Sequence, residues 1–215
     1  MSRIDKKLFI EDHYLGKPAD CRDKIITRRI ELVQQTEGFC GSQLSLVDVG
    51  CGNGASILLL SGKMKSCVGL DIYSGHKSTF DSMIKERDIK NCDFLLIDIE
   101  KDLSRLQAEA DPLQAENISK SGKINFKFDR LICFEVIEHL KNEQNVRKIY
   151  DLLKKGGLAA ITVPNKWWIF ETHGAKLPLL PWNRVPFFSW LPQPIHEKFA
   201  NARIYTKSKI KRLLQ

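Results

Sequence analysis

At residues 48–54 the chain reads DVGCGNG, directly after the apolar run LSLV and directly before ASILLL. The first run predicts a buried strand and the second a helix, so the three glycines lie where a strand turns into a helix. Glycine adopts positive φ and lets a ligand approach bare backbone, as a nucleotide-binding loop requires. The alternative is a tight turn without a ligand, because Gly-x-Gly-x-Gly by itself is a weak signal.

Acidic residues end the next two predicted strands. Asp71 closes CVGLD, where a carboxylate can accept hydrogen bonds from both ribose hydroxyls of a nucleotide. Asp98 closes DFLLID, where adenine can be held by its amino group. The alternative for each acid is a strand-end cap or a surface charge.

Outward from the loop, apolar runs alternate with helix-like segments. The five runs are LSLVDVG, CVGLD, DFLLID, FDRLICFE and LAAITV. Helices are expected at 25–37, 55–63, 78–88 and 142–155, with a turn at Gly156-Gly157 before the last strand. This order predicts an α/β fold, a Rossmann-like parallel sheet with helices on both faces.

We expect a single domain over residues 1–215. Its parts are an N-terminal helical segment at 1–43, a cofactor-binding core at 44–163, and an aromatic, basic cap with a C-terminal helix at 164–215. Residues 101–127 are polar, and they are expected to form an exposed insertion or a partly disordered loop, to which we assign no chemistry.

Five motifs occur in a fixed order, VDVGCGNG, GLDIY, DFLLIDIE, DRLICFEVIEHL and LLKKGGLAAITVPN. Over residues 44–165 the chain resembles class I S-adenosylmethionine-dependent methyltransferases, in the branch of ubiquinone-biosynthesis O-methyltransferases and small-RNA 2′-O-methyltransferases. The resemblance implies an enzyme with S-adenosylmethionine as its cofactor. It implies that the methionine end is held by Asp48, Gly50, Gly52 and Gly54, the ribose and adenine by Asp71, Ile72, Asp98 and Ile99, and that Phe134 borders the amino group and sulfonium.

Such domains usually end in a helix followed by an antiparallel hairpin. Here the last residues, IYTKSKIKRLLQ, resemble that helix, so we expect the C-terminal hairpin to be missing. Either the chain is truncated, or the sheet has an exposed edge, which favours association.

Glu135, Glu138 and His139 stand at positions i, i+3 and i+4, so a helical turn would place them on one face. One interpretation makes His139 a general base that Glu135 orients, because imidazole titrates near neutral pH. By the resemblance to the small-RNA branch, these three residues would instead hold Mg, Mn or Zn together with His173, or with His196 as the alternative. A third interpretation is that the carboxylates only cap the start of a helix.

Residues 164–215 differ in composition from the rest of the chain. They carry nine lysines or arginines against two acids, all four tryptophans and six of the eight prolines. The prolines exclude a long helix. The aromatic residues could complete a core, line an acceptor pocket or membrane-facing lid, or stack RNA bases. We favour a pocket for a small or lipid-linked hydroxyl acceptor, with peripheral membrane contact through this segment, and place nucleic acid second.

Composition narrows the class of protein further. The six cysteines form no Cys-x-x-Cys pair, and no apolar run reaches the roughly 18 residues of a membrane span. We therefore expect a cytoplasmic protein that can contact a membrane surface. A dinucleotide-dependent oxidoreductase is disfavoured because the loop lacks Gly-x-Gly-x-x-Gly spacing. A non-catalytic module with the cofactor fold stays an alternative.

Overall fold

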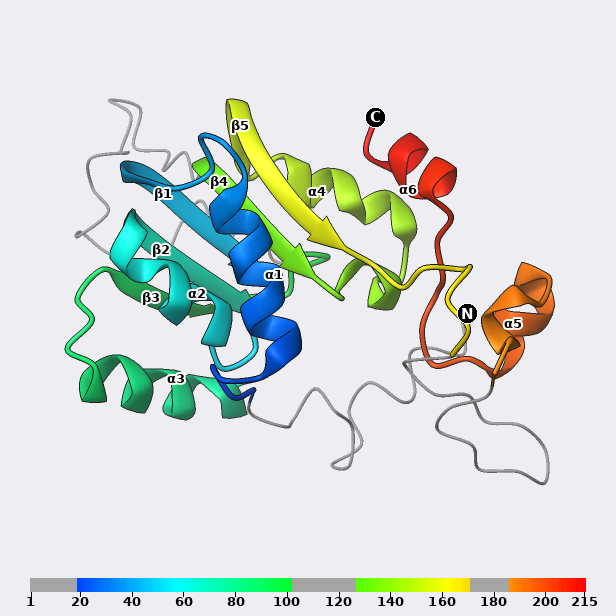
Figure 1. Ribbon diagram of the computed structural model, residues 1–215, viewed down its shortest axis with the longest axis horizontal. Helices are drawn as coiled ribbons and strands as arrows, with labels where there is room; N and C mark the ends of the chain where they lie inside the picture. Colours follow the sequence, from blue (N-terminus) through cyan, green and yellow to red (C-terminus); the bar gives the residue numbers. More distant parts are fainter. Residues whose placement is uncertain (1–18, 102–126, 171–185) are drawn as a thin grey trace. The chain divides into compact units, whose positions relative to one another are not determined.

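The computed structural model describes residues 19–101, 127–170 and 186–215 (Figure 1). The chain divides into two compact units. The sheet unit consists of the described residues of Tyr14–Cys133 and Lys148–Ala160. The cap unit consists of the described residues of Phe134–Arg147 and Ile161–Gln215.

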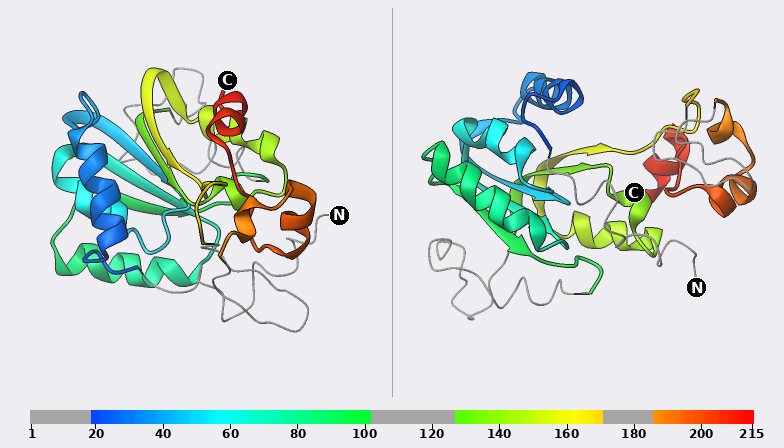
Figure 2. Two further views of the ribbon diagram at one scale, coloured as in Figure 1. Left: turned by 45° about the vertical axis from the view of Figure 1, so that its right-hand side comes forward. Right: turned by 90° about the horizontal axis from the view of Figure 1, so that it is seen from below.

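A five-stranded sheet forms the core of the sheet unit. Its strands are β1 (Gly41–Val49), β2 (Met64–Asp71), β3 (Cys92–Leu96), β4 (Phe128–Phe134) and β5 (Leu153–Thr162). They lie side by side in the order β3-β2-β1-β4-β5 (Figure 2). β1 pairs in parallel with both β2 and β4, and β2 with β3. The predicted Rossmann-like parallel fold is confirmed.

Three helices of the sheet unit share one hydrophobic cluster. They are α1 (Lys24–Gln35), α2 (Ala55–Leu60) and α3 (Gly75–Glu86), with the short η3 (Ser61–Lys63) after α2. Asp23 caps α1 by accepting a hydrogen bond from the Ile25 amide at 2.7 Å. Ala55 and Leu58 of α2 pack with Ile26 of α1 and Ile84 of α3. The alternation of apolar and polar residues thus produces the helices that the sequence predicts.

The helix predicted at 142–155 is much shorter in the structure. It consists of η7 (Glu143–Asn145) and α4 (Val146–Tyr150), and β5 already begins at Leu153. The prediction of a turn at Gly156-Gly157 is therefore wrong. Gly156 has a φ of 78°, and a Cβ on Gly157 would lie 2.9 Å from the Asp129 carbonyl oxygen, so the two glycines let β5 run close to β4.

The cap unit contains only short helices, as its prolines predict. They are η6 (Ile137–His139), η7 (Glu143–Asn145), η8 (Phe188–Trp190), α5 (Gln193–Phe199) and α6 (Lys207–Leu213), with the first two residues of α4. No helix within the described ranges is long and apolar enough to cross a membrane. The insertion at 101–127, apart from its two end residues, and His173 lie outside the described residues. In the described part of the chain the sheet has no strand beyond these five.

Candidate functional site

The glycine loop between β1 and α2 has a conformation that requires glycine. Gly50, Gly52 and Gly54 have φ values of 72°, 54° and 83°. The amides of Gly50 and Cys51 donate to the Leu70 carbonyl oxygen at 2.8 and 3.1 Å, which ties the loop to the end of β2. A Cβ on Gly52 would meet nothing within 4 Å, so a ligand can approach the backbone there.

Asp71, at the end of β2, faces this loop. Its Oδ2 atom accepts a hydrogen bond from the Gly52 amide at 2.8 Å, and its Oδ1 atom accepts one from the Tyr73 amide at 2.9 Å. The residue is therefore a strand-end cap. A carboxylate has about four acceptor positions, so lone pairs are left for two ribose hydroxyls as well. Beside it the Ile72 side chain is 43% exposed and offers an apolar surface to an adenine ring.

Asp48, near the end of β1, is buried. Burial, and then the negative charge of Asp71, raise the pKa of the Asp48 carboxyl well above its usual range. A cationic group brought next to Asp48 would favour its ionised form. The α-amino group of a methionine moiety is such a cation.

Asp98 and Ile99 follow β3 rather than closing it, because the strand ends at Leu96. The Ile97 amide donates to the Asp71 carbonyl oxygen at 2.8 Å, so this segment lies next to the end of β2. Asp98 accepts a hydrogen bond from the Glu100 amide and pairs with Lys101 at 2.8 Å. Ile99 is buried. The structure thus brings Asp48, Gly52, Asp71 and Asp98 to one edge of the sheet, and these residues fit an adenosyl cofactor.

Asn53 is a loop residue whose role the sequence analysis missed. Its side chain donates to the Ala19 carbonyl oxygen and accepts from the Ala19 amide, both at 2.9 Å. The side chain is buried and anchors the chain before α1 to the glycine loop. An amide side chain inside a glycine-rich loop is the signal that could have indicated this contact.

Around Glu135 the structure differs from the predicted helical turn. Phe134 ends β4, and Glu135 has a φ of 57°, which a right-handed helix does not allow. Its amide donates to the Thr162 carbonyl oxygen at 3.1 Å, and its Oε1 atom accepts from the Thr162 hydroxyl at 2.8 Å. Pairing with β5 therefore overrides helix formation, and only residues 137–139 form a helical turn, η6. The prediction that Glu135 shares a helical face with Glu138 and His139 is wrong.

The other candidate metal ligands are buried. Glu138 is fully buried in η6, beside the nearly buried His139. His196 is fully buried in α5, and its ring lies 5.0 Å from that of Phe188. Among the described residues, no group of three or more His, Cys, Asp or Glu side chains could hold a metal ion. His173 is outside those residues, so the metal site stays a hypothesis.

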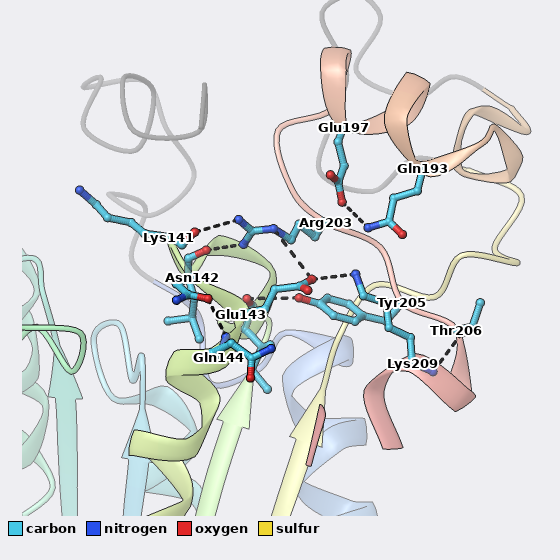
Figure 3. A network of polar contacts seen from close by, with 12 residues as sticks. Lys141, Asn142, Glu143, Gln144, Gln193, Glu197, Arg203, Tyr205, Thr206 and Lys209 are labelled. Carbon is cyan, nitrogen blue, oxygen red and sulfur yellow. Dashed lines mark hydrogen bonds and ion pairs between the residues drawn. The ribbon is translucent and has the colours of Figure 1, made fainter. Parts of the chain in front are cut away.

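A polar network in the cap unit was not predicted (Figure 3). It joins Glu143 to Arg203 and Lys209, whose nitrogen atoms lie 3.9 and 2.7 Å from its Oε1 atom. Tyr205 lies against the same group and is almost fully buried. These residues are about 60 positions apart from Glu143 in the chain, so no local pattern connects them.

Three proteins similar to this chain in sequence are named as methyltransferases. The ubiquinone biosynthesis O-methyltransferase of Rickettsia conorii is 25% identical over 191 residues, which are 85% of this chain and 59% of that protein. The protein of the same name from Rickettsia felis is 26% identical over 126 residues, 58% of this chain and 43% of that protein. The (S)-coclaurine N-methyltransferase of Papaver somniferum is 31% identical over 117 residues, covering 53% and 28% of the two chains. The chain thus spans less than two thirds of the length of these relatives.

Solved structures share the fold. A coclaurine N-methyltransferase bound to N-methylheliamine and SAH has a TM-score of 0.54 at 21% identity, covering 88% of this chain and 45% of that one. The YcgJ protein of Bacillus subtilis has a TM-score of 0.50 at 18% identity, covering 65% and 51%. A family described as a methyltransferase domain matches residues 21–215. The glycine loop, the acids at the strand ends and this match together show that the chain belongs to that methyltransferase family, with the class I fold that the sequence resembles.

Proposed function

We propose that this protein is an S-adenosylmethionine-dependent methyltransferase that methylates a hydroxyl group of a small or lipid-linked acceptor. The observation that carries the proposal is the glycine loop held open beside Asp71, whose carboxylate binds the Gly52 amide at 2.8 Å. The cofactor supplies a methyl group on a sulfonium, which is ready for in-line transfer. The protein then has to hold the cofactor, align the acceptor and accept the hydroxyl proton.

The sheet unit provides the residues for cofactor binding. Asp71 has free lone pairs for the ribose, Ile72 covers the adenine, and the open backbone at Gly52 accommodates the methionine end. Asp48 becomes ionised when the α-amino group binds beside it, since the two opposite charges compensate for burial. Asp98 and Ile99 border the adenine edge.

In the cap unit we assign proton acceptance to His139. Glu135 is held by Thr162, and this leaves the imidazole of His139, which has a ring nitrogen that can accept a proton. The fully buried Glu138 precedes His139 in the same helical turn. The turn therefore supplies both a base and a neighbouring carboxyl group.

Exposed aromatic rings in the cap unit support a lipid-linked acceptor and contact with a membrane surface. Trp167, Trp168 and Phe187 are more than half exposed, and Trp190 packs edge-on against Phe187 at 5.0 Å. The Lys166 amine lies 5.8 Å from the Trp167 ring. Aromatic rings interspersed with cations suit the interface of an anionic bilayer. The names of the Rickettsia relatives point to an acceptor of this kind.

Calorimetry and a transfer assay test the proposal. S-adenosylmethionine or its demethylated product should bind, and Asp71→Ala should weaken binding by about 1 to 3 kcal/mol, because hydrogen bonds to a charged group are lost. Asp81→Asn, on the exposed face of α3, is the control and should bind like the wild type. Tight binding of NADH with no binding of either adenosyl ligand would refute the cofactor assignment.

The acceptor is tested with a methyl-labelled cofactor against phenolic lipids, small amines and RNA. We expect label in the phenolic lipid, and His139→Ala should lower kcat about a hundredfold or more while cofactor affinity stays the same. Label on an amine or in RNA would replace the proposed acceptor by that class. Unchanged kcat in His139→Ala would leave the histidine a structural role.

Vesicle sedimentation tests the membrane contact. With vesicles that contain anionic lipid, Trp168→Ala should reduce the bound fraction of protein, since interfacial aromatic rings bury apolar area. Tyr150→Ala is the matched control, because Tyr150 is an equally exposed ring that belongs to the sheet unit. Equal binding of both variants and the wild type would remove the proposed role of this surface.

A further inference from the structure

The helical turn that carries His139 is held in place by side chains from the end of the chain. η6 has only three residues, and its own backbone bonds run from the His139 amide to Val136 and from the Leu140 amide to Ile137. So short a 3₁₀ turn is not stable by itself. The conformational entropy lost when the turn forms exceeds the free energy gained from its two hydrogen bonds. Its conformation must depend on tertiary contacts.

Arg203 provides three such contacts. Its amide donates to the Glu138 carbonyl oxygen at 3.3 Å, one guanidinium nitrogen donates to the Leu140 carbonyl oxygen, and another to that of Lys141 at 3.1 Å. A single residue therefore binds three backbone carbonyls of the segment around His139. A guanidinium can do this because its donors diverge in one rigid plane, whereas an ammonium is a point donor.

Tyr205 binds a fourth backbone carbonyl of this segment. Its hydroxyl donates to the Ile137 carbonyl oxygen at 3.4 Å. Burial, and then the charge of Glu143, raise the pKa of Tyr205 above its ordinary range, so the hydroxyl keeps its proton as a donor. The Tyr205 backbone also pairs with Pro164 and Lys166, each at 2.9 Å, just beyond the end of β5. Tyr205 thus ties η6 to the exit of β5.

Glu143 and Lys209 hold Arg203 and Tyr205 in turn (Figure 3). Glu143 attracts both cations, and the Lys209 amine lies 4.8 Å from the centre of the Tyr205 ring. Thr206 caps α6 by accepting from the Lys209 amide at 3.1 Å. The start of α6 therefore positions the residues that bind η6.

We propose that Arg203 and Tyr205 are positioning residues that set the orientation of Glu138 and His139 by binding the backbone carbonyls of Ile137, Glu138, Leu140 and Lys141. This inference rests on the proposed function, because it gives His139 a place in the reaction. Neither residue touches the acceptor or cofactor in this account. Each acts on the reaction through the backbone of η6.

Arg203→Lys tests the proposal, since it keeps the charge and loses the planar set of donors. We expect kcat to fall at least tenfold, while acceptor KM and cofactor affinity stay within twofold of wild type. Hydrogen exchange of the His139 and Leu140 amides should become at least tenfold faster. Arg147→Lys is the matched control, because Arg147 is exposed on α4, and it should match the wild type in every measurement.

Two further variants keep the test decisive if Arg203→Lys folds poorly. Tyr205→Phe removes a single hydroxyl and should lower kcat less than Arg203→Lys does. Arg203→Ala should regain part of its kcat in millimolar guanidinium chloride, because the free ion can occupy the donor position. A role in general stability predicts no such recovery, and the absence of recovery in a folded variant overturns the proposal.

The exchange measurement separates this inference from the proposed function. If the wild type transfers no methyl group to any acceptor, the proposed function fails. Faster exchange in Arg203→Lys would still show that Arg203 stabilises the conformation of η6. Unchanged exchange in Arg203→Lys would overturn the stabilising role of Arg203, whatever the activity. Faster exchange with wild-type kcat overturns the role of Arg203 in the reaction.

Discussion

Gly54 is a position in the glycine loop where a larger residue does not fit. It caps α2 with a φ of 83°, and a Cβ at this position would lie 2.3 Å from Cδ2 of the buried Phe80. We expect Gly54→Ala to lower the free energy of unfolding by about 2 to 4 kcal/mol, from left-handed strain and overpacking together. Urea denaturation measures this change.

Gly62→Ala is the control for that experiment. A Cβ at Gly62 would meet nothing within 4 Å, and its φ is not in the left-handed region. Its unfolding midpoint should stay close to that of the wild type. Equal midpoints for both variants would contradict the argument from strain and close contact.

Asp48 links stability to cofactor binding in the same loop region. Burial raises its folded pKa above the value of about 3.9 expected in the unfolded chain. The favourable contribution of Asp48 is therefore complete below that unfolded value, and it is lost as pH rises through the folded pKa. Asp48→Asn removes this loss, so without cofactor the variant should become more stable than the wild type as pH rises from 4 to 8.

Urea denaturation of both proteins across this pH range checks the prediction, and calorimetry should show weaker cofactor binding by Asp48→Asn. Asp81→Asn, an exposed change on α3, should give a difference that is nearly independent of pH. A difference between Asp48→Asn and the wild type that is constant from pH 4 to 8 would contradict the assigned shift.

At the scale of elements, Asp129 connects three strands of the sheet. It lies in β4 and accepts hydrogen bonds from the amide and hydroxyl of Ser45 in β1, at 2.9 and 2.7 Å. It also pairs with Lys154 of β5 at 3.0 Å. Burial opposes ionisation, but the bonds from Ser45 and Lys154 outweigh it and hold the pKa of Asp129 below its usual range. The side chain therefore helps to align β1, β4 and β5.

Asp129→Asn should lower the free energy of unfolding at pH 7 by about 1 to 3 kcal/mol, because hydrogen bonds to a charged group are lost. With a depressed folded pKa, this contribution is present above about pH 3.9 and is lost as pH falls through the folded value. The difference between wild type and variant, measured by thermal unfolding, should thus shrink below pH 4. Lys154→Met, which removes only a partly exposed ion pair, should cost about 1 kcal/mol or less. A larger loss of stability in Lys154→Met than in Asp129→Asn would contradict the role assigned to Asp129.

At the scale of the whole molecule, chelation decides between a general base and a metal site. We expect exhaustive treatment with EDTA to leave kcat unchanged, because Glu135 is engaged by Thr162 and does not share a helical face with Glu138 and His139. Turnover is measured before and after treatment, with metal content checked by mass spectrometry. Loss of activity that Mn²⁺, Mg²⁺ or Zn²⁺ restores would favour the metal site and direct attention to His173.

The unpaired edge of β5 is a second feature at the scale of the whole molecule. Among the described residues, β5 is the last strand of the sheet and pairs on one side only. Most of its residues are at least partly exposed, including Leu158. An edge of this kind can pair with another strand.

Several features of this protein follow from the sequence by itself. The buried run that ends at Val49, the three glycines after it and the acids near the ends of β2 and β3 are local signals, because burial and positive φ depend on nearby residues. The motif order predicts both the parallel fold and the family. The prolines of the cap predict short helices for the same local reason.

Other features are decided only by tertiary structure. Glu135 leaves the helix because Thr162 binds it, and Gly156 stays in a strand because β4 lies alongside. Asn53 forms hydrogen bonds with Ala19, 34 residues away, and Arg203 forms one with Leu140, 63 residues away. Hydrogen-bond energies depend on which groups the fold brings within about 3 Å, and no short window of sequence contains both partners of such a bond.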